Sequence, residues 1–340
     1  MNRSRRIILT AAAISALGIG FSFSARLTGT ARAAVGPVPP EALALPSDSA
    51  MVMGFDVRAL TASQFYAKFG GEGEPGRVEA LAELEKRTGL NPVRDIDSVV
   101  VAMGAPQPKA ADGSHHRDNG IVFVTGRFDA ARLEASIPEP GKAQKERRDG
   151  VTIYREATGK GTGEVALLDA GILVAGDATS IEAFLANRKT GRGIRDNHEL
   201  VNMLERVEPG STWWAVGGPS VLSRATSEIG GAAANLPNVK EVVAYGHLDP
   251  EVGMTATAEA ADAKSATKIA DVVRGFSAML SLQAGQKPEL AQIADSISVA
   301  TEQDKVLVKA TISHELIESL KKWAAENHGK ARKAADTVWQ

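Results

Sequence analysis

The chain has 340 residues, of which 44% are hydrophobic and 24% are charged, a composition typical of folded globular proteins rather than disordered ones. Residues 1–33 hold five arginines and no acid, so the rest of the chain carries 34 basic and 41 acidic side chains, a net charge of −7. An acidic body without a basic stripe argues against nucleic-acid binding, and the lack of cysteine excludes disulfides, thiolate metal ligands, a cysteine nucleophile and a lipid-anchored cysteine.

Residues 1–33 are typical of an export signal. Three arginines among the first six residues precede the apolar stretch Ile7 to Ser24, and Ala31-Arg-Ala33 fits a signal-peptidase cleavage site. The letters SRRIIL also resemble the twin-arginine motif, whose route carries folded proteins across the bacterial inner membrane. The alternatives are a general secretory signal and an uncleaved anchor, because 18 apolar residues can just span a bilayer. We expect cleavage close to Ala33, a periplasmic or secreted protein, and no membrane span in the mature chain.

Residues 34–46 contain four prolines and predict a stiff, extended linker. A first α+β unit, residues 47–205, follows it. Asp129 and Asp177 are predicted to cap helices, because an aspartate before an apolar run is a favoured N-cap. In chain order the pattern predicts a strand at 50–56, a helix at 77–87, strands at 96–103 and 121–128, a helix at 129–136, strands at 151–156, 164–168 and 172–175, and a helix after Asp177.

A second unit, residues 206–328, repeats that order and precedes a short tail, residues 329–340. Asp262 and Ser313 are its predicted helix caps. Its predicted strands lie at 211–218, 239–245, 254–259, 296–301 and 306–312. We interpret the chain as a tandem duplication with an α+β fold, in which each unit is a mainly antiparallel sheet with helices packed on one face. The alternative is a coincidence of common α+β patterns.

Four segments carry a resemblance to a known group of proteins. They read LPSDSAMVMGFDVRALTASQF, RTGLNPVRDIDSVVVA, IVFVTGRFDAARLEA and ILVAGDATSIEAFL. They are similar to segments of uncharacterised exported bacterial proteins of the acidobacterial type. The resemblance covers most of the first unit and the strand openings of the second, and it implies neither an activity nor functional residues.

Trp213 and Trp214 are the most suggestive pair of side chains. Neighbours on a strand point to opposite faces, so we expect one ring in the core and the other under a helix or in a groove. A tryptophan in a groove could stack on a sugar or anchor a protein partner. Both residues are therefore candidate ligand-binding residues, with core packing as the alternative.

His115, His116 and Asp118 form the candidate metal site. Imidazole and carboxylate groups bind zinc or copper, but these three lie in a polar insertion, and a solvated loop is the competing interpretation. His314-Glu315 resembles a zinc-protease helix, yet position 318 is glutamate where that motif needs histidine. We expect no cofactor.

No catalytic constellation stands out in this sequence. Asp196, three residues before Glu199, fits a capping box rather than a site. We therefore expect an exported, non-enzymatic protein that binds an unidentified protein or small molecule or has a structural role in the envelope. The alternative is an exported hydrolase whose residues come together only in the fold.

Overall fold

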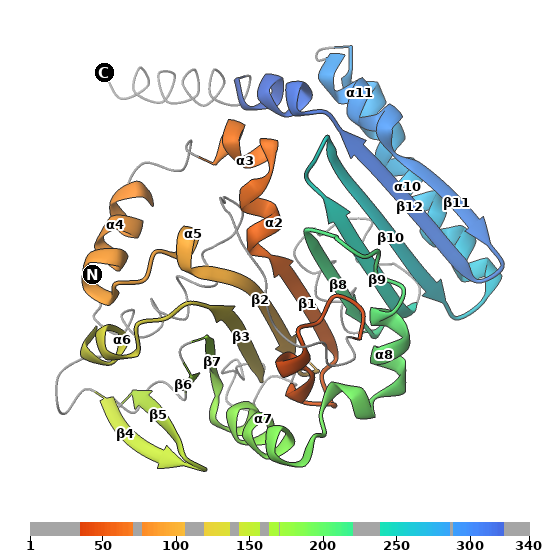
Figure 1. The fold of residues 1–340 in the computed structure, drawn as a ribbon. Coiled ribbons are helices and arrows are strands. Elements are labelled where there is room, and N and C mark those ends of the chain that lie inside the picture. Colours follow the sequence, from red (N-terminus) through yellow and green to blue (C-terminus); the bar gives the residue numbers. More distant parts are fainter. Residues whose placement is uncertain are drawn as a thin grey trace, which may run out of the picture.

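The computed structural model describes residues 35–70, 77–105, 119–136, 143–156, 163–169, 171–219, 239–285 and 288–322 (Figure 1). Within these residues the strands form one antiparallel, 12-stranded sheet in the order β11-β12-β10-β9-β8-β1-β2-β3-β7-β6-β5-β4. None of the described helices is long and apolar enough to cross a membrane. The fold is α+β, as the sequence predicts.

The strand bounds follow the predicted apolar runs closely. The strands are β1 Met51–Asp56, β2 Ile96–Met103, β3 Gly120–Gly126, β4 Ala143–Arg148, β5 Val151–Glu156, β6 Gly163–Asp169, β7 Ile172–Asp177, β8 Trp213–Gly217, β9 Val239–His247, β10 Val252–Ala260, β11 Ser298–Glu302 and β12 Lys305–Ile312.

The helices lie between and around these strands. They are η1 Pro40–Ala44, α2 Val57–Ala62, α3 Gln64–Phe69, α4 Arg77–Thr88, α5 Pro92–Asp95, α6 Ala130–Ser136, α7 Ala178–Thr190, η2 Ile194–Asp196, α8 His198–Leu204, α10 Ala263–Gln283 and α11 Pro288–Ser296, where η marks a 3₁₀ helix. Residues 314–322 are also helical.

Four of the predicted helix caps are present in the structure. The side chains of Asp129, Asp177, Asp262 and Ser313 each accept a backbone N–H three residues on, as predicted. The cap of α8 is different. Asn197 accepts the N–H of Leu200, whereas Asp196 accepts the N–H of Gly193 and so belongs to the preceding turn.

The central strands β1 and β8 pair antiparallel, and the order of strands is the same on either side of them. Moving outwards, the first half runs β1-β2-β3-β7-β6 and the second half runs β8-β9-β10-β12-β11. The first half adds the hairpin partners β5 and β4 at its outer edge. The two halves therefore have matching topology but share one continuous sheet.

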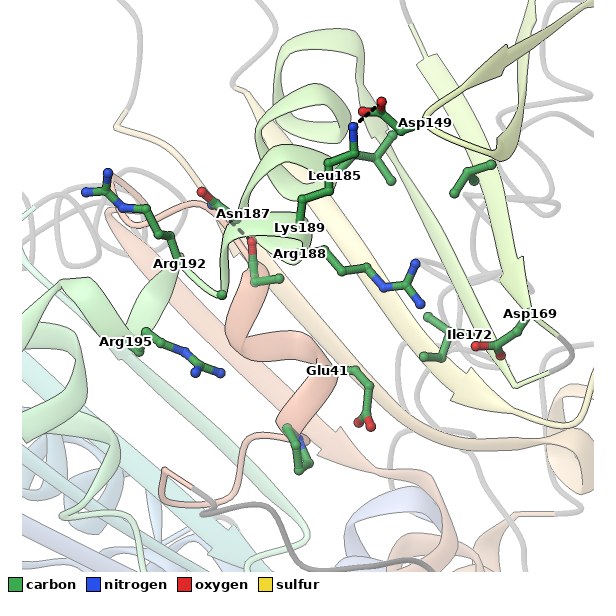
Figure 2. Close-up of a pocket in the computed structure, with 14 residues that line it drawn as sticks. Glu41, Asp149, Asp169, Ile172, Leu185, Asn187, Arg188, Lys189, Arg192 and Arg195 are labelled. Atoms are coloured by element: carbon green, nitrogen blue, oxygen red, sulfur yellow. Dashed lines mark hydrogen bonds and ion pairs between the residues drawn. The ribbon is translucent and has the colours of Figure 1, made fainter.

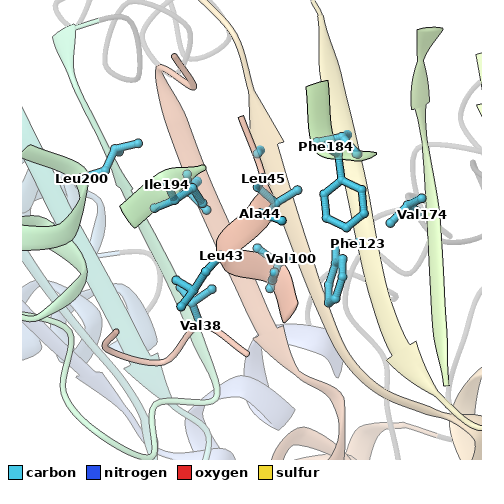
Figure 3. Close-up of a cluster of buried hydrophobic side chains, with 14 of the residues drawn as sticks. Val38, Leu43, Ala44, Leu45, Val100, Phe123, Val174, Phe184, Ile194 and Leu200 are labelled. Atoms are coloured by element: carbon cyan, nitrogen blue, oxygen red, sulfur yellow. The ribbon is translucent and has the colours of Figure 1, made fainter. Parts of the chain in front are cut away.

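The largest core among the described residues covers one face of the sheet, and Figure 3 shows part of it. Its members come from both halves. Phe123 on β3 packs against Phe184 on α7, with ring centroids 5.9 Å apart. The same cluster continues from β1 through β8 to β9, where its members are Val52, Trp214 and Val243. Because apolar burial is the main favourable term in folding, this shared core binds the halves into one structural unit.

The opposite face has its own helices, which corrects one expectation. On β2, Val99 and Val100 are adjacent and point to opposite faces, and Val99 packs with Leu60 of α2 and Leu133 of α6. In the second half, Ile269 of α10 packs with Val306 of β12 in a third buried cluster. Helices thus cover both faces of the first half, so the prediction of helices on one face is wrong there.

The proline-rich segment 34–46 is not the extended linker that its composition predicts. Residues 40–44 form η1, and Leu43 and Leu45 are fully buried in the main core. Gly36 has a φ of +56°, and a Cβ there would lie 2.3 Å from the carbonyl oxygen of Leu204. The prolines fit the 3₁₀ turn because its first N–H groups have no partner within the helix, so the segment belongs to the fold.

Candidate binding cleft

A cleft of about 540 Å³ opens where η1, the end of α7 and two strand turns meet (Figure 2). Its apolar wall consists of Ala44, Val151, Ile172 and Leu185. Charged side chains surround that wall: Glu41, Asp149, Asp169, Arg188, Lys189, Arg192 and Arg195. The volume lies within the range of about 300–1,000 Å³ that is usual for small-molecule sites.

The end of α7 gives the cleft its shape. Gly191 adopts the left-handed conformation with a φ of +70°, and its N–H and that of Arg192 donate to the carbonyl of Asn187. The side chain of Asn187 donates to the carbonyl of Ala44 over 3.1 Å, which fastens α7 to η1. This turn brings Arg188 and Arg195 to the same cleft from two different elements.

Two of the four cationic side chains are neutralised by acids. Lys189 forms an ion pair with Asp149. Arg192 Nε lies 3.1 Å from a carboxylate oxygen of Asp196. The hydrogen bond from Arg192, together with the N–H of Gly193, lowers the pKa of Asp196, so this pair stays charged over a wide pH range. Neither pair has charge left over for a ligand.

Arg188 and Arg195 differ from their neighbours. Among the described residues neither has an ion-pair or hydrogen-bond partner, and both extend into the cleft (Figure 2). The Nε atom of Arg195 is buried and has no acceptor. A buried donor left without an acceptor costs about 1–3 kcal/mol, so the guanidinium of Arg195 is not fully satisfied by the described residues.

The two tryptophans lie away from this cleft. Trp214 is only 3% exposed and belongs to the main core, where its ring lies over Gly54 of β1. A ligand has no access to that ring, so Trp214 is corrected from a candidate binding residue to a core residue. Trp213 points to the other face, is partly exposed, and lies over Gly246 of β9. Its role in binding stays a prediction.

The remaining predicted site residues lie outside the described residues. These are His115, His116 and Asp118 of the candidate metal site and Ala31 and Ala33 of the cleavage site. In the described part of the chain, no three His, Asp or Glu side chains come together as a metal site.

Sequence reasoning missed the cleft arginines, although a signal was present. The letters NRKTGRGIR, residues 187–195, place four basic side chains within eight positions directly after a predicted helix. Such a cluster beside glycines could have been taken as an anion-binding turn. Glu41 and Asp169 gave no signal, because only the fold brings η1 and the β6–β7 turn to α7.

Comparison with known proteins gives only a distant likeness in fold. No protein-family model matches the chain, and neither does any curated protein. Among solved structures, crystal form III of TP0453 aligns with a TM-score of 0.48 and 13% identity, covering 81% of this chain and 95% of that one. Crystal form I of TP0453 gives a TM-score of 0.46 and 12% identity, with 81% and 94% covered.

Proposed function

We propose that this protein is an exported binding protein that holds a small acidic ligand in the cleft between η1 and α7. The observation that carries the proposal is the pair Arg188 and Arg195, two cations in one cleft that form no ion pair or side-chain hydrogen bond among the described residues. A guanidinium offers two parallel N–H groups to a carboxylate or phosphate, and such charge-assisted hydrogen bonds are about twice as strong as neutral ones.

The composition of the cleft favours binding over catalysis. Among the described residues, the lining side chains include no serine, cysteine or histidine that could act as a nucleophile or a neutral-pH base. The apolar wall of the cleft, which includes Ile172 and Leu185, could hold the carbon skeleton of a ligand.

Direct binding measurements test this proposal. We would titrate the mature chain, starting at Ala34, with hexanoate, succinate and glycerol 3-phosphate in a calorimeter. We expect at least one of the three acids to bind, and Arg195→Gln or Arg188→Gln to weaken that binding roughly tenfold or more. The control Arg206→Gln removes a remote arginine that pairs with Glu241 and should bind as the parent does. Equal affinity in all three variants would contradict the proposal.

Export is the second part of the proposal. We infer that residues 1–33 direct the chain to the periplasm or the exterior and are removed near Ala31 and Ala33. The support is the sequence, in which Ala31-Arg-Ala33 follows the apolar stretch Ile7 to Ser24. In fractionated cells Arg5→Lys with Arg6→Lys should block export if the twin-arginine route is used. Normal export of this double variant would point to the general secretory route.

We further propose that the two halves arose by duplication of one unit. The support is the strand order, which is the same outwards from β1 and from β8. The helices α6 and α10 also follow corresponding strands and begin at corresponding aspartates, Asp129 and Asp262. Relatives in which only one unit is present would be the strongest additional support.

A further inference from the structure

The charges left over in the cleft are of both signs. Besides Arg188 and Arg195, two carboxylates line it, Glu41 from η1 and Asp169 from the end of β6. Among the described residues neither carboxylate has an ion-pair partner. One oxygen of Asp169 accepts the N–H of Gly171 over 2.7 Å, which holds the side chain at the rim and leaves its other oxygen available.

Figure 2 shows how the four groups lie in the cleft. The guanidinium of Arg188 extends toward Ile172 and Asp169, whereas Arg195 extends toward η1 and Glu41 projects from the other side of η1. The cleft therefore presents cations and carboxylates that do not pair with one another among the described residues. If these groups served only as internal ion pairs, they would be joined as Lys189 and Asp149 are.

A ligand with charge of one sign is expected to bind this arrangement less tightly than a ligand with both signs. A pure anion bound by the arginines leaves Glu41 and Asp169 unpaired in the same cleft, and their like charge opposes its binding. A pure cation would meet the same difficulty with the arginines. A ligand that carries both signs can pair with an arginine and a carboxylate of the cleft at the same time.

We infer that the ligand is zwitterionic, with a carboxylate or phosphate for the arginines and a protonated amine for Glu41 or Asp169. This inference rests on the proposed function. The apolar wall of Val151, Ile172 and Leu185 between the charged groups suits an apolar portion between the two charges of the ligand. Short peptides with free ends and phosphate–amine headgroups share this chemistry.

The test compares matched ligands in a calorimeter with the mature chain. The probes are the dipeptide Ala-Leu, its N-acetyl form, its C-terminal amide, and glycerophosphoethanolamine. We expect Ala-Leu or glycerophosphoethanolamine to bind, and the one that binds identifies the source of the charges. If the peptide binds, acetylation and amidation should each weaken it roughly tenfold or more, since each removes a charge-assisted hydrogen bond.

Variants separate this inference from the proposed function. Glu41→Gln with Asp169→Asn should remove the preference for the free amine, so that Ala-Leu and N-acetyl-Ala-Leu bind equally, while Arg206→Gln should leave the preference intact. An N-acetyl peptide or simple acid that binds the parent protein as tightly as Ala-Leu would overturn the zwitterion inference and leave the anion cleft standing. No binding by any acid, peptide or headgroup would overturn both.

Discussion

At the scale of single residues, two glycines make room for the tryptophan pair at the centre of the sheet. A Cβ on Gly54 would lie 2.4 Å from the ring of Trp214, which is buried in the core and has no space to move. We expect Gly54→Ala to destabilise the protein by about 1–3 kcal/mol, the usual cost of overpacking a core. Urea unfolding followed by circular dichroism measures the change.

The matched control is Gly253, a strand glycine on β10. A Cβ added there meets nothing within 4 Å. Gly253→Ala should therefore change the free energy of unfolding by less than about 1 kcal/mol, and with either sign. If both variants lost the same stability, close packing of Trp214 on Gly54 would not be the cause.

Glu164 is the most deeply buried charge among the described residues. Its side chain is 0% exposed and receives hydrogen bonds from Arg148 and Arg155. The hydrogen bonds that Arg148 donates to Glu146 and Glu164 raise its pKa, so the arginine remains charged. We expect Glu164→Gln to cost about 1–3 kcal/mol in urea unfolding, because it leaves partly buried guanidinium groups short of an acceptor.

Glu146 provides the comparison for Glu164, since it contacts the same arginine from the surface. Its side chain is 51% exposed. Exposed ion pairs contribute little, so Glu146→Gln should lose clearly less stability than Glu164→Gln. Equal losses would mean that burial does not decide the strength of this network.

At the scale of elements, η1 shows why composition alone predicted the wrong role for a segment. Four prolines suggested an extended chain, but the apolar residues between them, Leu43 and Leu45, are in the core. We expect Leu45→Ala to cost about 2–5 kcal/mol, the range for a buried leucine that leaves a cavity. Glu41→Gln, an exposed change on the same turn, should be near neutral in the same unfolding assay.

Strand β4 is the one described strand that the sequence did not predict. Its residues, AQKERR, are polar after the first alanine, so no apolar alternation marks them. The strand forms because it pairs with β5 at the edge of the sheet, where charged side chains face water. Strands with a buried face, such as β2 and β5, do have an apolar pattern, and they were predicted at their observed bounds.

The helix at 314–322 is attached to the first half through α3. The ring of His314 packs edge-on against Phe65 and Phe69 of α3, with centroids 5.8 and 6.1 Å apart, and Lys68 pairs with Glu315 and Glu318. The pKa of Glu315 is lowered by a hydrogen bond with its own backbone N–H and then by Lys68, and the pKa of Glu318 by Lys322 and then by Lys68. A carboxyl group whose pKa is lowered in the folded protein stabilises the fold at pH values above its ordinary pKa of 4.5. This stabilisation is lost as the pH falls through the lowered pKa of the folded protein.

We therefore expect acid to loosen the contact between 314–322 and α3 before the sheet unfolds. Hydrogen exchange of 314–322, corrected for the intrinsic rate, should increase below the ordinary carboxyl pKa. Lys68→Met should raise the exchange rate of 314–322 already at neutral pH. The control Lys240→Met removes a lysine that pairs with Glu259 and Asp304 on the sheet, and exchange of 314–322 should not change. Unchanged exchange in Lys68→Met would show that the ion pairs do not hold the helix.

At the scale of the whole molecule, the sequence indicated two units, and the structure joins them in one sheet. The individual strands were predictable because each has its own apolar pattern. The pairing of β1 with β8 was not, because Met53 and Ala215 face one another only after more than 150 residues of intervening chain have folded. The cleft depends on similar long-range placement, so its arginines were visible in the sequence while their carboxylate neighbours were not.

The continuous core leads to the last prediction, that the protein unfolds in one cooperative transition. Val52, Trp214 and Val243 lie in the same buried cluster, so neither half can open without exposing apolar surface of the other. Unfolding curves from far-ultraviolet circular dichroism and tryptophan fluorescence should coincide. Val216→Ala, at the junction beside Val52, should cost about 1–3 kcal/mol and reduce hydrogen-exchange protection equally in β7 and β12. Two separate transitions, or a loss of protection confined to one half, would instead show that each half folds around a core of its own.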